Sequence, residues 1–310
     1  MAGIRVGMFA PIGPFASADK PLEALSAGVA PITDSGIDHV CVNDHVSFFT
    51  GAGSDALINA TSLLSHYPEL PCYVALYLLP LRHPVLVARQ LASIAELYPG
   101  RLTLGVGIGG EDRHELEICG VSPTTVGRRM DESLQILRPL LAGKPVSFEG
   151  EFFPVRDALI VPAPEAPIPL IVGGRSDAAV RRAGRFGDGW LGIWVSPRRF
   201  GSVVEQIGEH AGHADRDPSG FEHAINVWCG FGPTRQAARA PLATGMQDFY
   251  QMPFEPFERY SPYGTPEEVA DFLYPYVDAG CTVFNVIPCA SDNETAVAAV
   301  AELRRLLTSA

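Results

Sequence analysis

Short apolar runs alternate with amphipathic segments from one end of this sequence to the other, and this alternation constrains the fold more than any other feature. Eight runs have the length of buried strands: residues 4–10, 39–43, 73–79, 102–106, 169–172, 190–193, 224–229 and 283–287. Between them, apolar residues recur every three or four positions, as in Val87, Leu91, Ile94 and Tyr98, which is typical of a helix with one buried face. Eight such units predict an α/β fold, the (β/α)8 (TIM) barrel, as one domain over residues 1–310.

A doubly wound open sheet is the alternative fold. That fold commonly opens with a Gly-x-Gly-x-x-Gly turn after its first strand, and this sequence has no such turn there. The barrel is therefore favoured.

Three segments depart from a minimal barrel. Residues 144–157 have the pattern of a small hairpin with its turn at Glu149-Gly150, and the proline-rich residues 161–167 predict a stiff connector before the fifth strand. Residues 245–263 carry six aromatic side chains, together with Met252, among prolines. Because so many rings are rarely left in solvent, we expect this segment to cover a pocket or a subunit interface.

Charge and composition restrict the class of partner. The chain has 23 basic and 35 acidic residues, a formal net charge of -12, and no run of Lys or Arg, so nucleic-acid binding is not expected. The first residues do not resemble a leader, and no apolar run reaches the roughly 18 residues that cross a membrane. We expect a cytoplasmic protein that does not bind membranes. The six scattered cysteines lack metal-ligand spacing, so no metal site is predicted.

The clearest binding signal lies between residues 169 and 190. An apolar run ending at Val172 is followed by Gly173, Gly174, Arg175 and Ser176, after which a helix is predicted. Glycines at this place let a ligand approach the backbone, and the start of a helix offers N–H groups to an anion. The pattern indicates a phosphate site; a tight strand-to-helix turn is the alternative explanation.

Catalytic candidates follow the second and fourth predicted strands, where the active site of a barrel lies. Asp44 and His45 follow the second strand, and a histidine beside an acid is suited to proton transfer, although a structural histidine is the alternative. The fourth strand leads into a loop with four glycines, in which Gly107, Ile108 and Gly109 could approach a flat ligand. Glu111 or Asp112 could act as an acid there. A flexible turn would explain that loop as well.

Two arginines, Arg128 and Arg129, lie at the start of the next long predicted helix. They could bind the anionic tail of a ligand. A solvated surface position is the alternative for both.

Taken together, these motifs resemble the bacterial luciferase-like superfamily of flavin and deazaflavin oxidoreductases. The resemblance spans nearly the whole chain, apart from residues 245–263. It is carried by residues 43–45 (Asn-Asp-His), 80–84 (Pro-Leu-Arg-His-Pro), 100–107, 128–132, 171–176, 187–190 and 264–269.

The resemblance implies a metal-free barrel that binds FMN or the deazaflavin coenzyme F420, with its phosphate on residues 173–176. It also implies a non-proline cis peptide within Ala75, Leu76 and Tyr77. Residues 43–45 and 97–101 resemble the F420-dependent branch more closely. In the sugar-phosphate dehydrogenases of that branch an acidic residue directly follows the fourth strand, whereas here Gly110 takes that place and Glu111 comes one residue later.

We therefore predict an F420-dependent oxidoreductase that transfers a hydride between the deazaflavin and a small organic substrate, and that forms a homodimer. His45, oriented by Asp44, and Glu111 are the predicted catalytic residues. The predicted cofactor-binding residues are Asp44, Ala75, Leu76, Tyr77, Gly107, Ile108, Gly109, Arg128, Gly173, Gly174, Arg175 and Ser176. The alternatives are an FMN-dependent monooxygenase and a non-catalytic flavin-binding protein.

Overall fold

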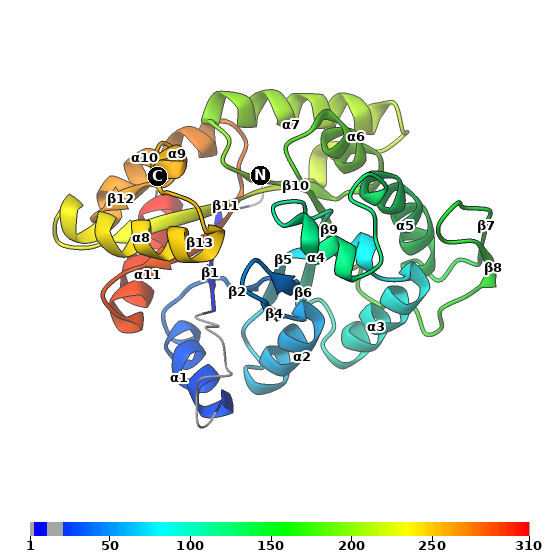
Figure 1. The fold of residues 1–310 in the computed structure, drawn as a ribbon, viewed down its shortest axis with the longest axis horizontal. Coiled ribbons are helices and arrows are strands. Elements are labelled where there is room, and N and C mark those ends of the chain that lie inside the picture. The colour runs from blue at the N-terminus through cyan, green and yellow to red at the C-terminus, as the bar shows by residue number, and fades with distance from the viewer. Residues whose placement is uncertain (1–2, 11–20, 310) are drawn as a thin grey trace. The chain divides into compact units, whose positions relative to one another are not determined.

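The computed structural model describes residues 3–10 and 21–309. Eight parallel strands alternate with helices along the chain (Figure 1), and the fold is the predicted (β/α)8 barrel rather than an open sheet. By its internal contacts the chain divides into two compact units. The first comprises Met1–Val42, Leu191–Gln206 and Glu222–Ala310, and the second comprises Asn43–Trp190 and Ile207–Phe221.

Parallel strands form the core of the first unit. In it, β1 (Arg5–Phe9) lies between β2 (His39–Val42) and β13 (Val283–Cys289), and β13 pairs in turn with β11 (Glu222–Phe231). A two-residue strand, β12 (Tyr263–Gly264), extends β11.

The second unit contains the other strands of the barrel. Here β5 (Cys72–Leu78) pairs with β6 (Leu102–Gly107), and β6 pairs with β9 (Leu170–Gly173). Strand β10 (Gly189–Ile193) begins in this unit and continues into the first. All eight predicted strands are present, and their ends differ from prediction by at most two residues.

The helices begin where the sequence provides capping residues. The side chain of Asp55 caps α2, Pro84 starts α3, and Thr265 and Glu268 form a capping box at α10. The helices are α1 (Pro21–Thr33), α2 (Ala56–His66), α3 (Pro84–Leu97), α4 (Arg113–Ile118), α5 (Val126–Leu141), α6 (Asp177–Phe186), α7 (Pro197–Gly212), α8 (Arg235–Tyr250), α9 (Glu255–Glu258), α10 (Pro266–Asp278) and α11 (Asn293–Thr308). None of these described helices combines the length and apolar character needed to cross a membrane.

The predicted hairpin after α5 is present, with a wider connection than expected. Strands β7 (Val146–Phe148) and β8 (Val155–Ala158) pair in antiparallel fashion, but residues 149–154 join them instead of a tight turn at Glu149-Gly150. The carboxylate of Glu132 on α5 accepts hydrogen bonds from the backbone N–H groups of residues 151, 152 and 153 at 2.8–3.0 Å. Three donors bound to one carboxylate explain why the connection is held open.

The aromatic segment 245–263 is continuous with the core of the first unit. It begins inside α8, and Tyr250 and Phe254 are buried. The indole N–H of Trp228 donates a hydrogen bond to the hydroxyl of Tyr250 at 3.2 Å. Part of the segment is therefore structural, and its role as a cover for a pocket or interface stays a prediction.

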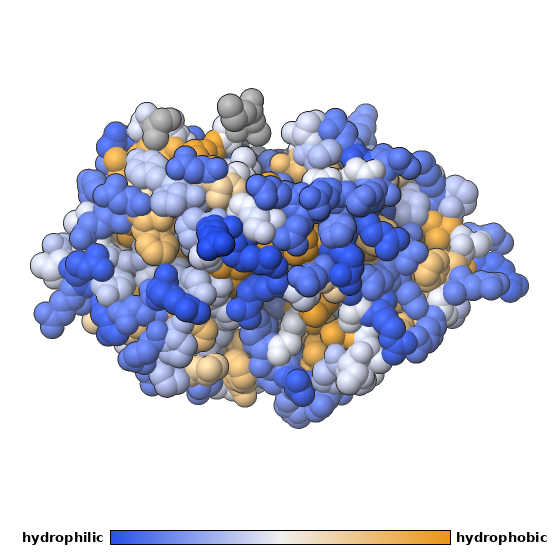
Figure 2. Space-filling model, turned by 90° about the horizontal axis from the view of Figure 1, so that it is seen from above, coloured by the Kyte–Doolittle hydropathy of each residue, from blue (hydrophilic) through white to orange (hydrophobic). Residues whose placement is uncertain are grey.

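Hydrophilic residues dominate one face of the molecule. On the face drawn in Figure 2 they cover most of the area, and hydrophobic residues form small groups between them. This distribution agrees with the strongly acidic composition.

Candidate active site

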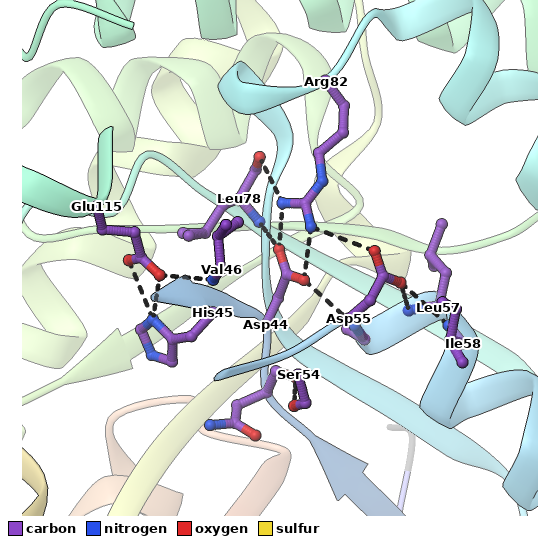
Figure 3. Close-up of polar contacts among 12 residues, drawn as sticks. Asp44, His45, Val46, Ser54, Asp55, Leu57, Ile58, Leu78, Arg82 and Glu115 are labelled. Carbon is purple, nitrogen blue, oxygen red and sulfur yellow. Dashed lines mark hydrogen bonds and ion pairs between the residues drawn. The ribbon is translucent and has the colours of Figure 1, made fainter. Parts of the chain in front are cut away.

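His45 and Glu115 form the central pair of the candidate site, which lies entirely in the second unit (Figure 3). His45 begins β3 (His45–Phe48), directly after the loop that ends β2, and Glu115 lies on α4. The Nδ1 atom of His45 is 3.2 and 3.3 Å from the two carboxylate oxygens of Glu115. The ring of His45 also stacks on Phe48, with 3.9 Å between the ring centroids.

The Glu115 carboxylate is buried, and both of its oxygens take part in hydrogen bonds. Its side chain is 2% exposed, and it also accepts hydrogen bonds from the backbone N–H groups of Val46 at 2.7 Å and Ser47 at 3.2 Å. Burial raises the pKa of this carboxyl, but the bonds from His45, Ser47 and Val46 outweigh it, so the pKa is lowered overall. Glu115 is therefore a carboxylate at neutral pH.

Asp112, a second carboxylate of the same segment, fixes the chain at the end of β3. Asp112 caps α4 by accepting a hydrogen bond from the N–H of His114, and its second oxygen accepts one from the N–H of Phe49 at 2.7 Å. Together, Asp112 and Glu115 fix residues 45–49. Sequence reasoning missed this hairpin, which β3 forms with β4 (Ala52–Ser54).

Asp44 has a different partner from the one predicted. Its carboxylate is buried and binds both terminal nitrogens of the Arg82 guanidinium, at 2.5 and 2.9 Å. It also accepts hydrogen bonds from the N–H groups of Leu78 and Ala56. The expectation that Asp44 orients His45 is therefore wrong, because its oxygens bind these donors and the ring nitrogen of His45 is held by Glu115.

Glu111, the predicted acid, lies in the loop before α4 and is exposed. The buried carboxylate near His45 is supplied four residues later by Glu115, and a catalytic role for Glu111 stays a prediction. A signal for Glu115 was present in the sequence. Residues 112–115 read Asp-x-x-Glu, a pattern that starts helices and places the glutamate in the first turn.

Strand β5 carries the predicted cis peptide, between Ala75 and Leu76. The side chain of Leu76 lies against three glycines of neighbouring strands. A Cβ atom on Gly105, Gly107 or Gly173 would come within 2.8, 2.7 or 2.3 Å of Leu76 side-chain carbons. The packing of Leu76 therefore requires glycine at these three positions, whether or not a ligand is bound.

The predicted phosphate loop joins β9 to α6. Gly174 has φ +125°, a conformation that side chains disfavour, and its carbonyl accepts a hydrogen bond from the indole N–H of Trp190 at 2.8 Å. Because the C=O and N–H of one peptide point in opposite directions, the N–H of Arg175 points away from Trp190. Ser176 caps α6 through its side chain.

The other predicted cofactor residues lie in varied environments. Tyr77 is buried, with the Arg82 guanidinium 4.4 Å from its ring centroid, and burial raises the pKa of its hydroxyl. Ile108 is half-buried, and Gly109 has φ +67°. Arg128 is exposed and forms an ion pair with Glu151.

Comparisons with known proteins match this architecture. An F420-dependent glucose-6-phosphate dehydrogenase of Beutenbergia cavernae is 31% identical over 249 residues, which covers 78% of this chain and 72% of that enzyme. An uncharacterized protein of Mycobacterium tuberculosis is 44% identical over 129 residues, and this match spans 44% of its length.

Solved structures show the same fold at low identity. An F420-dependent secondary alcohol dehydrogenase has a TM-score of 0.82 at 20% identity and covers 98% of this chain and 99% of its own. The EDTA monooxygenase of a Chelativorans species has a TM-score of 0.77 at 16% identity, covering 99% and 94%. The family model described as luciferase-like monooxygenase matches residues 4–264, and the chain therefore belongs to that family.

Proposed function

We propose that this protein is an oxidoreductase that uses coenzyme F420 to transfer a hydride to or from a small organic substrate. The observation that carries the proposal is the hydrogen-bonded pair of His45 and Glu115. A buried carboxylate on Nδ1 fixes the ring of His45, and we assign proton exchange with the reacting groups to Nε2. Relatives named as F420-dependent enzymes support the choice of cofactor.

The residues present fit such a cofactor. The start of α6 and the loop at Gly174 would bind a phosphate, and β5, whose register with β6 shifts between Val74 and Tyr77, would support a flat ring at Leu76. When bound, the deazaflavin supplies or accepts the hydride. The protein's own contribution is to hold the ring in place, to exclude water, and to move a proton through Nε2 of His45.

Two alternatives make different predictions. An FMN-dependent monooxygenase would need oxygen, and an EDTA monooxygenase is among the proteins with the same fold. A non-catalytic flavin-binding protein would bind cofactor without turnover, but the fixed His45–Glu115 pair disfavours a purely binding role.

The proposal is tested by titrating the purified protein with coenzyme F420 and with FMN, followed by turnover without oxygen. We expect tight binding of F420 and anaerobic oxidation of its reduced form by a suitable acceptor. The variant His45→Ala should slow this reaction by about 10²–10⁴-fold while cofactor affinity changes much less. The exposed His114 on α4 provides the control, and His114→Ala should retain activity. Turnover only with reduced FMN and oxygen would support the monooxygenase instead.

The expectations of a cytoplasmic location and a homodimer stay predictions. The half-buried rings of Phe249 and Phe257 would suit a subunit contact. Light scattering of the purified protein measures the oligomeric state directly.

A further inference from the structure

One face of α6 carries a row of basic side chains along a cavity. Ala178, Arg181, Arg182 and Arg185 are spaced as one stripe of the helix, and they line a cavity of about 200 Å³ together with Asp131 of α5 and Phe186. The small side chain of Ala178 lies in the first turn of α6, next to the loop at Gly174. The cavity therefore begins one helical turn from the proposed phosphate site.

Within the described part of the chain, two of the arginines that line this cavity have no acidic partner. Its acidic lining residue, Asp131, is engaged by Arg182, whose Nε and Nη2 atoms lie 2.6 and 3.1 Å from the two carboxylate oxygens. Arg182 is buried, and it also donates to the carbonyl of Gly127. Among residues 3–10 and 21–309, no carboxylate forms an ion pair with Arg181 or Arg185.

This excess of positive charge is unusual in a chain with a net charge of -12. Arg128, which the sequence suggested for an anionic tail, is already paired with Glu151. Arg181 and Arg185 are exposed at the cavity, so their guanidinium groups can reach a bound anion without breaking an existing ion pair.

We propose that this cavity binds the polycarboxylate tail of coenzyme F420, with Arg181 and Arg185 as its ligands. The inference rests on the proposed function and deepens it. Beyond its phosphate, F420 continues into a chain of glutamates, whereas FMN ends at the phosphate. Arg185 follows Ala178 by seven positions, a rise of about 10 Å along the helix, which about three residues of an extended chain would span.

The test compares two cofactors and three proteins. The cofactors are F420 with its glutamates and the same deazaflavin phosphate without them. The proteins are the wild type, the double variant Arg181→Gln/Arg185→Gln, and the control Arg156→Gln/Arg198→Gln, which removes two exposed arginines elsewhere and changes the net charge equally. Dissociation constants are measured by fluorescence titration at low and high salt.

We expect the wild type and the control to bind the glutamate-bearing cofactor about three- to tenfold more tightly than the truncated one at low salt, the range for two exposed charge pairs. The double variant should lose this difference and keep the affinity for the truncated cofactor, which also shows that it is folded. Equal loss of affinity for both cofactors, or no loss for either, would overturn the tail site while leaving the proposed function intact. Failure of the wild type to bind either cofactor would overturn both.

Discussion

The carboxylate of Glu115 binds Nδ1 of His45 and, through the same oxygen, the backbone N–H groups of the two residues that follow. One side chain on α4 therefore sets both the orientation of the histidine ring and the course of the strand that carries it. This arrangement makes Glu115 a positioning residue for the chemistry that we propose for His45.

We expect Glu115→Gln to slow turnover by roughly 10- to 100-fold, less than the loss of His45 itself, because a neutral amide binds the His45 ring and the backbone N–H groups less strongly than a carboxylate does. The pH profile of kcat should shift as well. Glu117→Gln, an exposed change on the same helix, is the control. An unchanged pH profile in Glu115→Gln would argue for a purely structural glutamate.

The buried ion pair of Asp44 and Arg82 should dominate the stability of this region. Asp44→Asn leaves the Arg82 guanidinium without its main partner and should lower the free energy of unfolding by about 3–5 kcal/mol, measured in urea. Asp292→Asn, at the start of α11, is the matched control because asparagine also caps helices. Equal losses in the two variants would contradict this assignment.

Leu76 and Gly173 should behave as a coupled pair. Gly173→Ala places a Cβ atom 2.3 Å from a Leu76 methyl carbon and should cost about 1–3 kcal/mol of stability and weaken cofactor binding. Adding Leu76→Ala should recover part of both losses. Gly208→Ala, where no atom lies within 4 Å of the new Cβ, is the control and should be neutral or slightly stabilising. Strictly additive effects would refute the coupling.

His39 should make the protein acid-labile. Burial lowers the pKa of this histidine to about 4 from 6.5, although a hydrogen bond with Asn285 opposes the shift. The unfolded chain therefore binds the proton first as the pH falls below about 6.5, and stability is lost as the pH approaches 4. The loss from His39 should be on the order of 2 kcal/mol by pH 5.

The measurement is urea unfolding of the wild type and His39→Gln between pH 8 and pH 4.5. The variant should lose part of the pH dependence, whatever its absolute stability. His66→Gln, at an exposed position, should keep the wild-type slope. His223, whose pKa burial also lowers to about 4, accounts for a further part of the slope.

The barrel strands could be predicted from sequence because each is a local apolar run with its own boundaries. The hairpin of β3 and β4 could not, since its strands are four and three residues long and carry no alternation of buried and exposed side chains. It is held by Asp112 and Glu115, which lie more than 60 residues away along the chain.

The places of the candidate site residues in the fold could be predicted from the sequence, but only some of their bonding partners could. His45 and the loop at Gly174 lie where strands end, and that position can be inferred from the order of elements. Which carboxylate meets His45 depends on how far α4 turns after Asp112, a tertiary contact that residue spacing does not encode.

The packing of Leu76 against three glycines has a consequence for how this sequence can change over time. A larger residue at position 105, 107 or 173 meets the Leu76 side chain, and Gly105 also faces the carbonyl of Val74 at 2.5 Å. A larger residue can therefore be accepted at position 173 only after a smaller side chain has replaced Leu76. Among relatives, these two positions should vary together or not at all.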